Sequence, residues 1–222
     1  MPEPSPSVLL TRHGLSEHNL ETHVYMGRSP GSRLVAEGRV QAQALGAYLA
    51  RSAPVSRIVA SSLPRTLETA DLIAAALGRV PIEADDAFWE LSKGSWEGTM
   101  PRDGVPEPER TLWETRPFDF RFPAGESFAR VVERVAPAFE RWAGLYPRER
   151  LLFVLHGDVV CALLYHLLRF PPEQIRRHLV TPCSLTELTR EDGAWRLLRF
   201  SDDGFLDLGR GAGERKGQPP GA

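Results

Sequence analysis

Short apolar runs alternate along the chain with longer segments in which apolar residues recur every three or four positions. A short apolar run bounded by polar or turn residues predicts a buried strand, and the longer period predicts a helix with one buried face. Strands are predicted at residues 7–11, 57–60, 151–155, 184–189 and 195–200, and helices at residues 39–50, 64–77, 127–143 and 159–168. This alternation is typical of an α/β protein, here a three-layer α/β/α sandwich with a mostly parallel central sheet.

The 222 residues contain no internal repeat and no linker, which favours a single domain over residues 1–208. Residues 99–123 form an irregular stretch too long for an ordinary connection, so we expect an insertion or lid over a site. Residues 209–222 are rich in glycine, proline and charge and predict a disordered tail.

The amino-acid composition limits which binding partners and which cellular compartment are expected. With 27 basic and 29 acidic residues the net charge is −2, so neither nucleic acid nor a membrane is expected as a partner. No apolar stretch approaches the roughly 20 residues that span a bilayer, and no secretory signal is evident. The two cysteines lack CxxC spacing and are too few for a disulfide framework. A cytoplasmic protein is expected, and the pattern predicts no particular oligomeric state.

Chemically versatile residues follow three of the predicted strands. Arg12, His13 and Gly14 end the first, Ser61 with Arg65 one turn later follows the second, and His156 follows the third. The carboxyl ends of parallel strands share one edge of a sheet, where ligands bind. Each feature alone also fits a turn or a solvated surface. Together they predict a local site for a dianionic phosphoryl group, aided by helix N-termini.

Several ordered sequence blocks support this interpretation. They are TRHGLSEHN at residues 11–19, LVAEGRVQAQALG at 34–46, SSLPRTLETA at 61–70, WELSKGSWEG at 89–98, GES at 125–127 and LHGDVV at 155–160. With these blocks the chain resembles the histidine phosphatase superfamily, also called the phosphoglycerate mutase-like family, over about residues 8–200. The final segment PCSLTEL, at 182–188, is more similar to the phosphatase branch.

The resemblance implies a role for each matching residue. His13 would be the nucleophile that becomes phosphohistidine, Arg12, Arg65 and His156 would bind the transferring phosphoryl group, and Glu90 would protonate the leaving oxygen. The positions expected to bind phosphate or substrate are Ser16, Asn19, Gly27 and Gly157. A neutral imidazole is a competent nucleophile near pH 7, and guanidinium forks suit phosphate oxygens. The resemblance implies no metal and no cofactor.

The proton donor is assigned by the resemblance alone. Apolar neighbours such as Trp89 and Leu91 would raise the pKa of the Glu90 carboxyl group and favour its protonated form. Without the resemblance, Glu97 or Asp86 would be equally good candidates.

We therefore predict a metal-independent phosphomonoesterase that hydrolyses small phosphorylated metabolites through a phosphohistidine intermediate. One alternative is a cofactor-dependent phosphoglycerate mutase, but such mutases carry paired arginines in the insertion, whereas Arg110, Arg116 and Arg121 stand singly here. A second alternative is a catalytically weak regulatory module that binds phosphorylated ligands. Retention of His13 and Glu90 argues against it.

Asp158 departs from the family pattern, in which phosphatases commonly have glycine and mutases asparagine. Its charge would weaken binding of a dianion, or its side chain would cap the following helix. We favour the cap.

The insertion leaves two further questions open. Trp113, Phe118 and Phe120 would either wall the leaving group or anchor the loop by packing. Arg116 and Arg121 would either meet a second negative group or face solvent.

Overall fold

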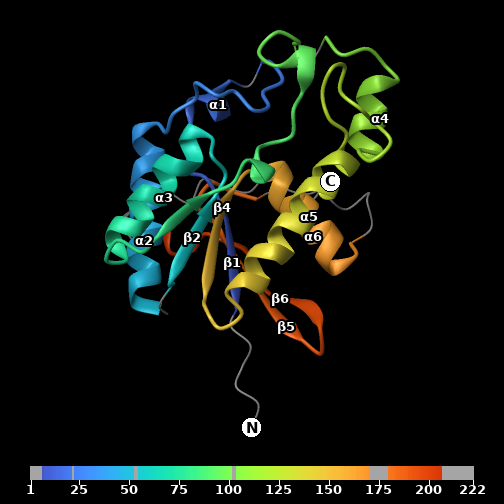
Figure 1. The fold of residues 1–222 in the computed structure, drawn as a ribbon. Helices are drawn as coiled ribbons and strands as arrows, with labels where there is room; N and C mark the ends of the chain where they lie inside the picture. The colour runs from blue at the N-terminus through green and yellow to red at the C-terminus, as the bar shows by residue number, and fades with distance from the viewer. Residues whose placement is uncertain (1–6, 22, 53–54, 102–103, 171–179, 207–222) are drawn as a thin grey trace.

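The structure, a computed structural model, describes residues 7–21, 23–52, 55–101, 104–170 and 180–206. One six-stranded sheet, in the order β3-β2-β4-β1-β5-β6, forms its centre (Figure 1). The strands are β1 (Val8–Arg12), β2 (Arg57–Ala60), β3 (Ile82–Ala84), β4 (Leu151–Leu155), β5 (Leu185–Glu191) and β6 (Ala194–Asp202). The pairs β1–β4, β4–β2 and β2–β3 are parallel, whereas β5 runs antiparallel to β1 and to β6. The predicted mostly parallel sheet is confirmed.

Helices cover both faces of this sheet (Figure 1). They are α1 (Glu17–Leu20), α2 (Ala36–Ser52), α3 (Pro64–Ala76), α4 (Glu109–Thr115), α5 (Phe128–Leu145) and α6 (Gly157–Leu168), with short 3₁₀ turns η1 (Asp86–Phe88) and η2 (Gly94–Trp96). Successive strand residues point to opposite faces. Leu152 therefore packs in the core with α2 and α3, and its neighbour Phe153 packs in the core with α5 and α6. The predicted three-layer α/β/α class is confirmed.

The register of the parallel strands brings three strand ends to one edge. Arg12 at the end of β1 is paired with Leu155 at the end of β4, and Ala60 at the end of β2 with Val154. The chain continues this alignment, because the His13 amide donates to the Leu155 carbonyl at 2.9 Å. The expected convergence of the three sequence blocks is confirmed.

Several boundaries differ from the sequence prediction. β3 was not predicted, because it has only three residues, none of them fully buried. Helix α2 begins at Ala36, three residues before the predicted start, since its first turn contains no large apolar side chain that would indicate a helix. The predicted tail at 209–222 lies outside the described residues. Within the described ranges, no helix is long and apolar enough to cross a membrane.

The insertion at 99–123 is less irregular than expected, since it contains α4. Trp113 and Phe120 are buried in an aromatic cluster with Phe122, their ring centroids lying 4.9 to 6.0 Å apart. Phe118 packs on Phe128 and Tyr165, with ring centroids 5.3 and 4.2 Å away. Of the two alternatives for these aromatic residues, the structure shows packing anchors.

Candidate active site

His13 is buried at the centre of the site, directly after β1. Its Nδ1 lies 2.8 Å from the Gly14 carbonyl oxygen, and Arg65 Nε lies 3.2 Å from its Nε2. A guanidinium can only donate, so Nε2 must accept and Nδ1 must carry the proton that is donated to Gly14. Burial, followed by the charges of Arg65 and Arg12, lowers the pKa of His13 well below its ordinary value. The ring is therefore neutral, with its Nε2 lone pair facing Arg65.

Arg65, in the first turn of α3, is a fully buried cation. Its guanidinium donates to the carbonyl oxygens of Gly27 at 3.2 Å, Arg28 at 2.7 Å and Ser29 at 3.3 Å. Burial is the main reason that its pKa falls to about 10, which still leaves it charged at neutral pH. These acceptors are neutral, so the guanidinium retains its positive charge for an anion.

Arg12 and His156 each present a buried nitrogen without a hydrogen-bond partner in the described part of the chain. Arg12 Nη1 donates to the Val180 carbonyl at 2.9 Å, but its Nε is unpaired. His156 Nε2 lies 2.9 Å from Ser61 Oγ, and its Nδ1 is unpaired. The His156 ring meets His13 edge-on, with centroids 5.2 Å apart. Since buried polar atoms are normally paired, these two nitrogens suit an incoming ligand with acceptor oxygens.

Glu90 follows η1 and is 8% exposed. Its Oε1 accepts from the Leu91 amide at 2.9 Å and its Oε2 from the Asp158 amide at 3.4 Å. Burial, and next the charge of Asp158, raise the pKa of Glu90 to about 7, although Lys93 opposes the rise. The direction agrees with the prediction from apolar neighbours. The contribution of Asp158 was not foreseen.

The prediction that Asp158 caps a helix is wrong. His156 is the N-cap of α6, and Asp158 lies in the first turn. Its carboxylate instead accepts from Lys93 Nζ at 2.8 Å. Lys93 is 5% exposed, and its ammonium lies 4.6 Å from the ring centroids of both Trp113 and Phe122. The pair forms because a buried ammonium requires a counter-charge, and Lys93 in turn neutralises the carboxylate that departs from the family pattern.

Ser16 and Asn19 hold the chain after the histidine in place. The Ser16 amide donates to Asn19 Oδ1 at 3.0 Å, which is the contact that the third residue of a capping box makes at α1, and the Ser16 hydroxyl donates to the same oxygen at 3.0 Å. Gly14 permits a close approach to α2, because a Cβ at this position would lie 2.4 Å from the Gly38 carbonyl oxygen. These contacts therefore fix the backbone that follows His13.

The two remaining predicted binding residues are glycines, of which Gly27 lies at a close contact and Gly157 does not. A Cβ on Gly27 would lie 2.3 Å from Glu97 Oε1, and the Gly27 carbonyl accepts from Arg65. Gly157 begins α6, where a Cβ would lie 3.7 Å from Arg12 Nε. All predicted site residues thus lie around the carboxyl edge of the sheet. Their roles in binding and catalysis remain predictions.

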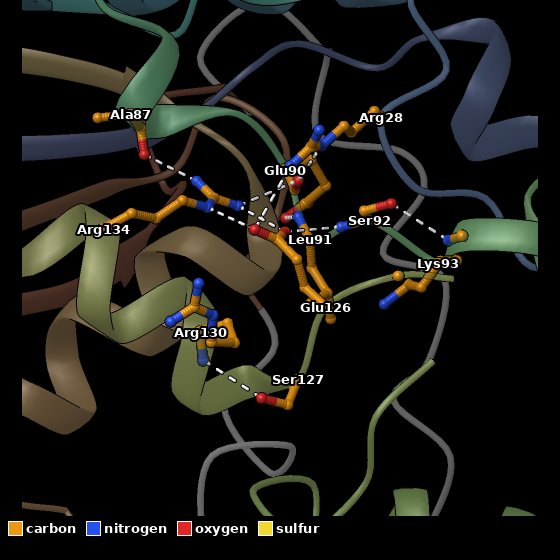
Figure 2. Close-up of polar contacts among 12 residues, drawn as sticks. Arg28, Ala87, Glu90, Leu91, Ser92, Lys93, Glu126, Ser127, Arg130 and Arg134 are labelled. Carbon is orange, nitrogen blue, oxygen red and sulfur yellow. Dashed lines mark hydrogen bonds and ion pairs between the residues drawn. The ribbon is translucent and has the colours of Figure 1, made fainter. Parts of the chain in front are cut away.

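Sequence reasoning missed residues that support this site, among them Arg28, Lys93, Glu126 and Arg134. Two signals were available: Lys93 is one of only two lysines in the chain, and Glu126 belongs to the GES block. Figure 2 shows Glu126 and Arg134 beside the segment that carries Glu90. Among the described residues, no group of three or more His, Cys, Asp or Glu side chains is arranged to hold a metal ion.

The fold and this cluster define an α/β protein with a cationic site at the carboxyl edge of its sheet. Comparison with known families agrees: the pattern of the histidine phosphatase superfamily (branch 1) matches residues 8–203. The chain belongs to this superfamily, and this membership supports its assignment as a phosphatase enzyme.

Relatives extend the comparison. The chain is 33% identical over 192 residues to a protein of Yersinia enterocolitica named "Probable phosphoglycerate mutase GpmB", covering 85% of this chain and 86% of that protein. It is similar in structure to YhfR of Bacillus stearothermophilus, with a TM-score of 0.83 and 25% identity; the match covers 91% of this chain and 100% of YhfR. A mycobacterial glucosyl-3-phosphoglycerate phosphatase superposes with a TM-score of 0.78 and 24% identity, over 89% of this chain and 99% of that protein. At this identity, the similarity shows only that the two proteins share a fold.

Proposed function

We propose that this protein is a metal-independent phosphomonoesterase that hydrolyses small phosphorylated metabolites through phosphorylation of His13. One observation carries the proposal: the His13 ring is neutral and held by Gly14, while its Nε2 lone pair faces the guanidinium of Arg65. A nucleophile and a phosphate-binding cation therefore meet at one point. Arg12 Nε and His156 Nδ1 supply further unpaired nitrogens for phosphoryl oxygens.

The proposed reaction has two displacement steps. His13 Nε2 attacks phosphorus, the bond from phosphorus to the leaving oxygen breaks, and protonated Glu90 gives its proton to that oxygen. Water then attacks the phosphohistidine, the ionised Glu90 accepts a proton from it, and the phosphorus–nitrogen bond breaks to release phosphate. Arg12, Arg65 and His156 stabilise the charge on the phosphoryl oxygens in both steps.

The test is release of inorganic phosphate, in EDTA, from a panel of phosphomonoesters that includes 3-phosphoglycerate. We expect release by the parent protein and none by the His13→Ala variant. A radiolabelled phosphoryl group should be trapped on the parent as an acid-labile, base-stable adduct. If the parent releases no phosphate from any ester, the phosphatase proposal fails, and tight binding of the esters would favour the regulatory module.

A cofactor-dependent phosphoglycerate mutase is the second candidate, because of the 33% identity to a protein named as a probable enzyme of that kind. The insertion supports the phosphatase instead. Arg110 and Arg116 pair with Glu107 and Asp119 at 2.5 Å, and the exposed Arg121 donates to the Gly125 carbonyl. Of the two alternatives for Arg116 and Arg121, the structure thus shows exposed side chains engaged by local partners. A mutase would interconvert 3- and 2-phosphoglycerate when primed with bisphosphoglycerate, without net release of phosphate.

Residues 99–123 are proposed to cover the leaving-group side of the site, within a single domain of residues 1–208. The contact that supports this is the Lys93 ammonium, which lies between Asp158 at the start of α6 and the rings of Trp113 and Phe122 in the insertion. Substitutions in the insertion should therefore change the ranking of esters more than they change phosphorylation of His13.

A further inference from the structure

Two charged residues, Glu126 and Arg134, form hydrogen bonds with the main chain of the segment that carries Glu90 (Figure 2). Arg134 Nη1 donates to the Ala87 carbonyl at 2.7 Å, and its Nη2 donates to the Glu90 carbonyl at 3.2 Å. These two acceptors lie on either side of Trp89. One guanidinium thus spans the turn from which the Glu90 side chain projects.

Glu126 orients that guanidinium and also holds the far end of the same segment. Its carboxylate accepts from Arg134 Nε at 2.8 Å and Nη2 at 3.0 Å, and from the Ser92 amide at 3.0 Å. The Glu126 amide in turn donates to the Ser92 carbonyl at 3.0 Å. The backbone is therefore fixed both before and after Glu90.

A second arginine joins the same carboxylate to the phosphate side of the site. Arg28 Nη2 lies 3.4 Å from Glu126 Oε1, and Arg28 Nε lies 3.4 Å from the Glu90 carbonyl oxygen. The carbonyl of Arg28 itself accepts from Arg65 Nη1 at 2.7 Å. Glu126 is thus two contacts away from both the Glu90 backbone and the guanidinium that faces His13.

Glu126 and Arg134 are both held by helix α5, and the Glu126 carboxyl group is ionised. Glu126 directly precedes Ser127, whose hydroxyl caps α5 by accepting from the Arg130 amide at 3.3 Å, and Arg134 lies about two turns along that helix. The Glu126 side chain is only 18% exposed. Burial raises the pKa of Glu126, but hydrogen bonds from Arg134 and Ser92 outweigh burial and leave the pKa below its usual value.

We propose that Glu126 and Arg134 are positioning residues for the proton donor, fixing the main chain of residues 87–92 so that the Glu90 carboxyl group meets the leaving oxygen. This inference rests on the proposed function. Both side chains act through the backbone of the segment. A misplacement of about 1 Å can cost about a hundredfold in rate, so a loosened segment should impair proton transfer strongly.

Two esters whose leaving groups differ in their need for a proton can distinguish a positioning role from general structural support. A nitrophenolate departs without a proton, whereas the alkoxide of glycerol 3-phosphate needs one. For the variants Glu126→Gln and Arg134→Lys we expect kcat/KM to fall about tenfold or more on glycerol 3-phosphate and less than about threefold on p-nitrophenyl phosphate. The ratio kcat/KM reports the steps up to departure of the leaving group, so the later hydrolysis of the phosphohistidine, which both esters share and in which Glu90 acts as the base, does not enter it. The variant Glu90→Gln should show the same pattern more strongly. Equal losses on both esters would overturn the inference.

A matched control is available on β5. Glu187 is 12% exposed and also bridges two arginines, Arg150 at 2.5 Å and Arg199 at 3.9 Å, but far along the chain from the Glu90 segment. Glu187→Gln should reproduce the loss of a buried ion pair, measured as a lower Tm, and leave kcat/KM on both esters unchanged. If Glu187→Gln also produces the leaving-group pattern, the effect is not specific to the network and the inference fails.

A double variant tests whether Glu126 acts through Glu90. In the Glu90→Gln background, Glu126→Gln should lower kcat/KM on glycerol 3-phosphate by less than about twofold, because the group it positions is already lost. Full multiplication of the two losses would contradict the inference. The two proposals fail differently: an inactive parent removes the phosphatase proposal, whereas an active parent with uniform losses removes only the positioning role.

Discussion

Replacing Glu90 with glutamine is expected to stabilise the folded protein at pH 8 while impairing catalysis. The Glu90 carboxyl group is buried, which, with the charge of Asp158, raises its pKa from 4.5 to about 7. As the pH rises above 4.5, the unfolded chain ionises at this position first, so the parent loses stability until the folded pKa is passed. At about 1.4 kcal/mol per pKa unit, this loss is at most about 3 kcal/mol. Glutamine does not ionise, so the Glu90→Gln variant does not undergo this loss of stability.

Urea denaturation of the parent and the Glu90→Gln variant at pH 5, 6, 7 and 8 measures this difference in unfolding free energy. Burial lowers the pKa values of His13 and His156, so both proteins lose stability as the pH falls below the ordinary histidine range, and this contribution cancels. Any hydrogen bond lost by glutamine does not depend on pH and shifts the whole difference equally. The variant's relative stability should rise with pH by up to about 3 kcal/mol. A flat or falling difference would refute a raised pKa and, with it, Glu90 as a protonated donor near neutrality.

Three further outcomes are expected. Asp158→Asn removes a charge that raises the pKa of Glu90, so the alkaline limb of a pH–rate profile on glycerol 3-phosphate should move to lower pH; an unchanged limb would contradict the coupling. Gly38→Ala would place a Cβ 2.0 Å from the Leu15 carbonyl oxygen, a backbone atom, so the melting temperature should fall by several degrees together with activity, whereas a normal Tm would disprove the close approach. Leu152→Ala, in the centre of the sheet, should cost about 2–5 kcal/mol of unfolding free energy in urea with little change in KM, and a cost below about 1 kcal/mol would argue against the described core.

Five of the six strands and the mostly parallel character of the sheet could be predicted from the sequence, because apolar runs identify buried strands directly. In β4 (Leu151–Leu155) every residue is buried, and in β1 (Val8–Arg12) all but the last are. Parallel pairing then places the polar residues after these strands at a common edge, whatever the details of the helices. The short β3 escaped because three half-buried or exposed residues carry no periodic signal.

The charge pairs of the site could not be predicted in the same way. Lys93 and Asp158 are 65 positions apart, and nothing local in either segment shows that one requires the other. Asp158 follows a strand and a glycine, a position where a helix cap is the commonest local explanation. Only the packing of α6 against the Glu90 segment reveals a buried ammonium that needs this carboxylate.

The protein has a net charge of −2, so a site that attracts a dianion needs local positive charge. Cations that have no acidic partner can supply this charge, whereas cations in salt bridges cannot. Within the described residues, neither Arg12 nor Arg65 forms a salt bridge, and their guanidinium groups donate to carbonyl oxygens and to His13. Lys93 is instead neutralised by Asp158. Under the proposed function, a phosphoryl group would meet uncompensated charge at His13, whereas a leaving group beside Lys93 would meet an ion pair and aromatic rings. We expect discrimination among esters to depend on the shape of the leaving group more than on its charge, because a second anion there would have to displace Asp158 from its buried partner.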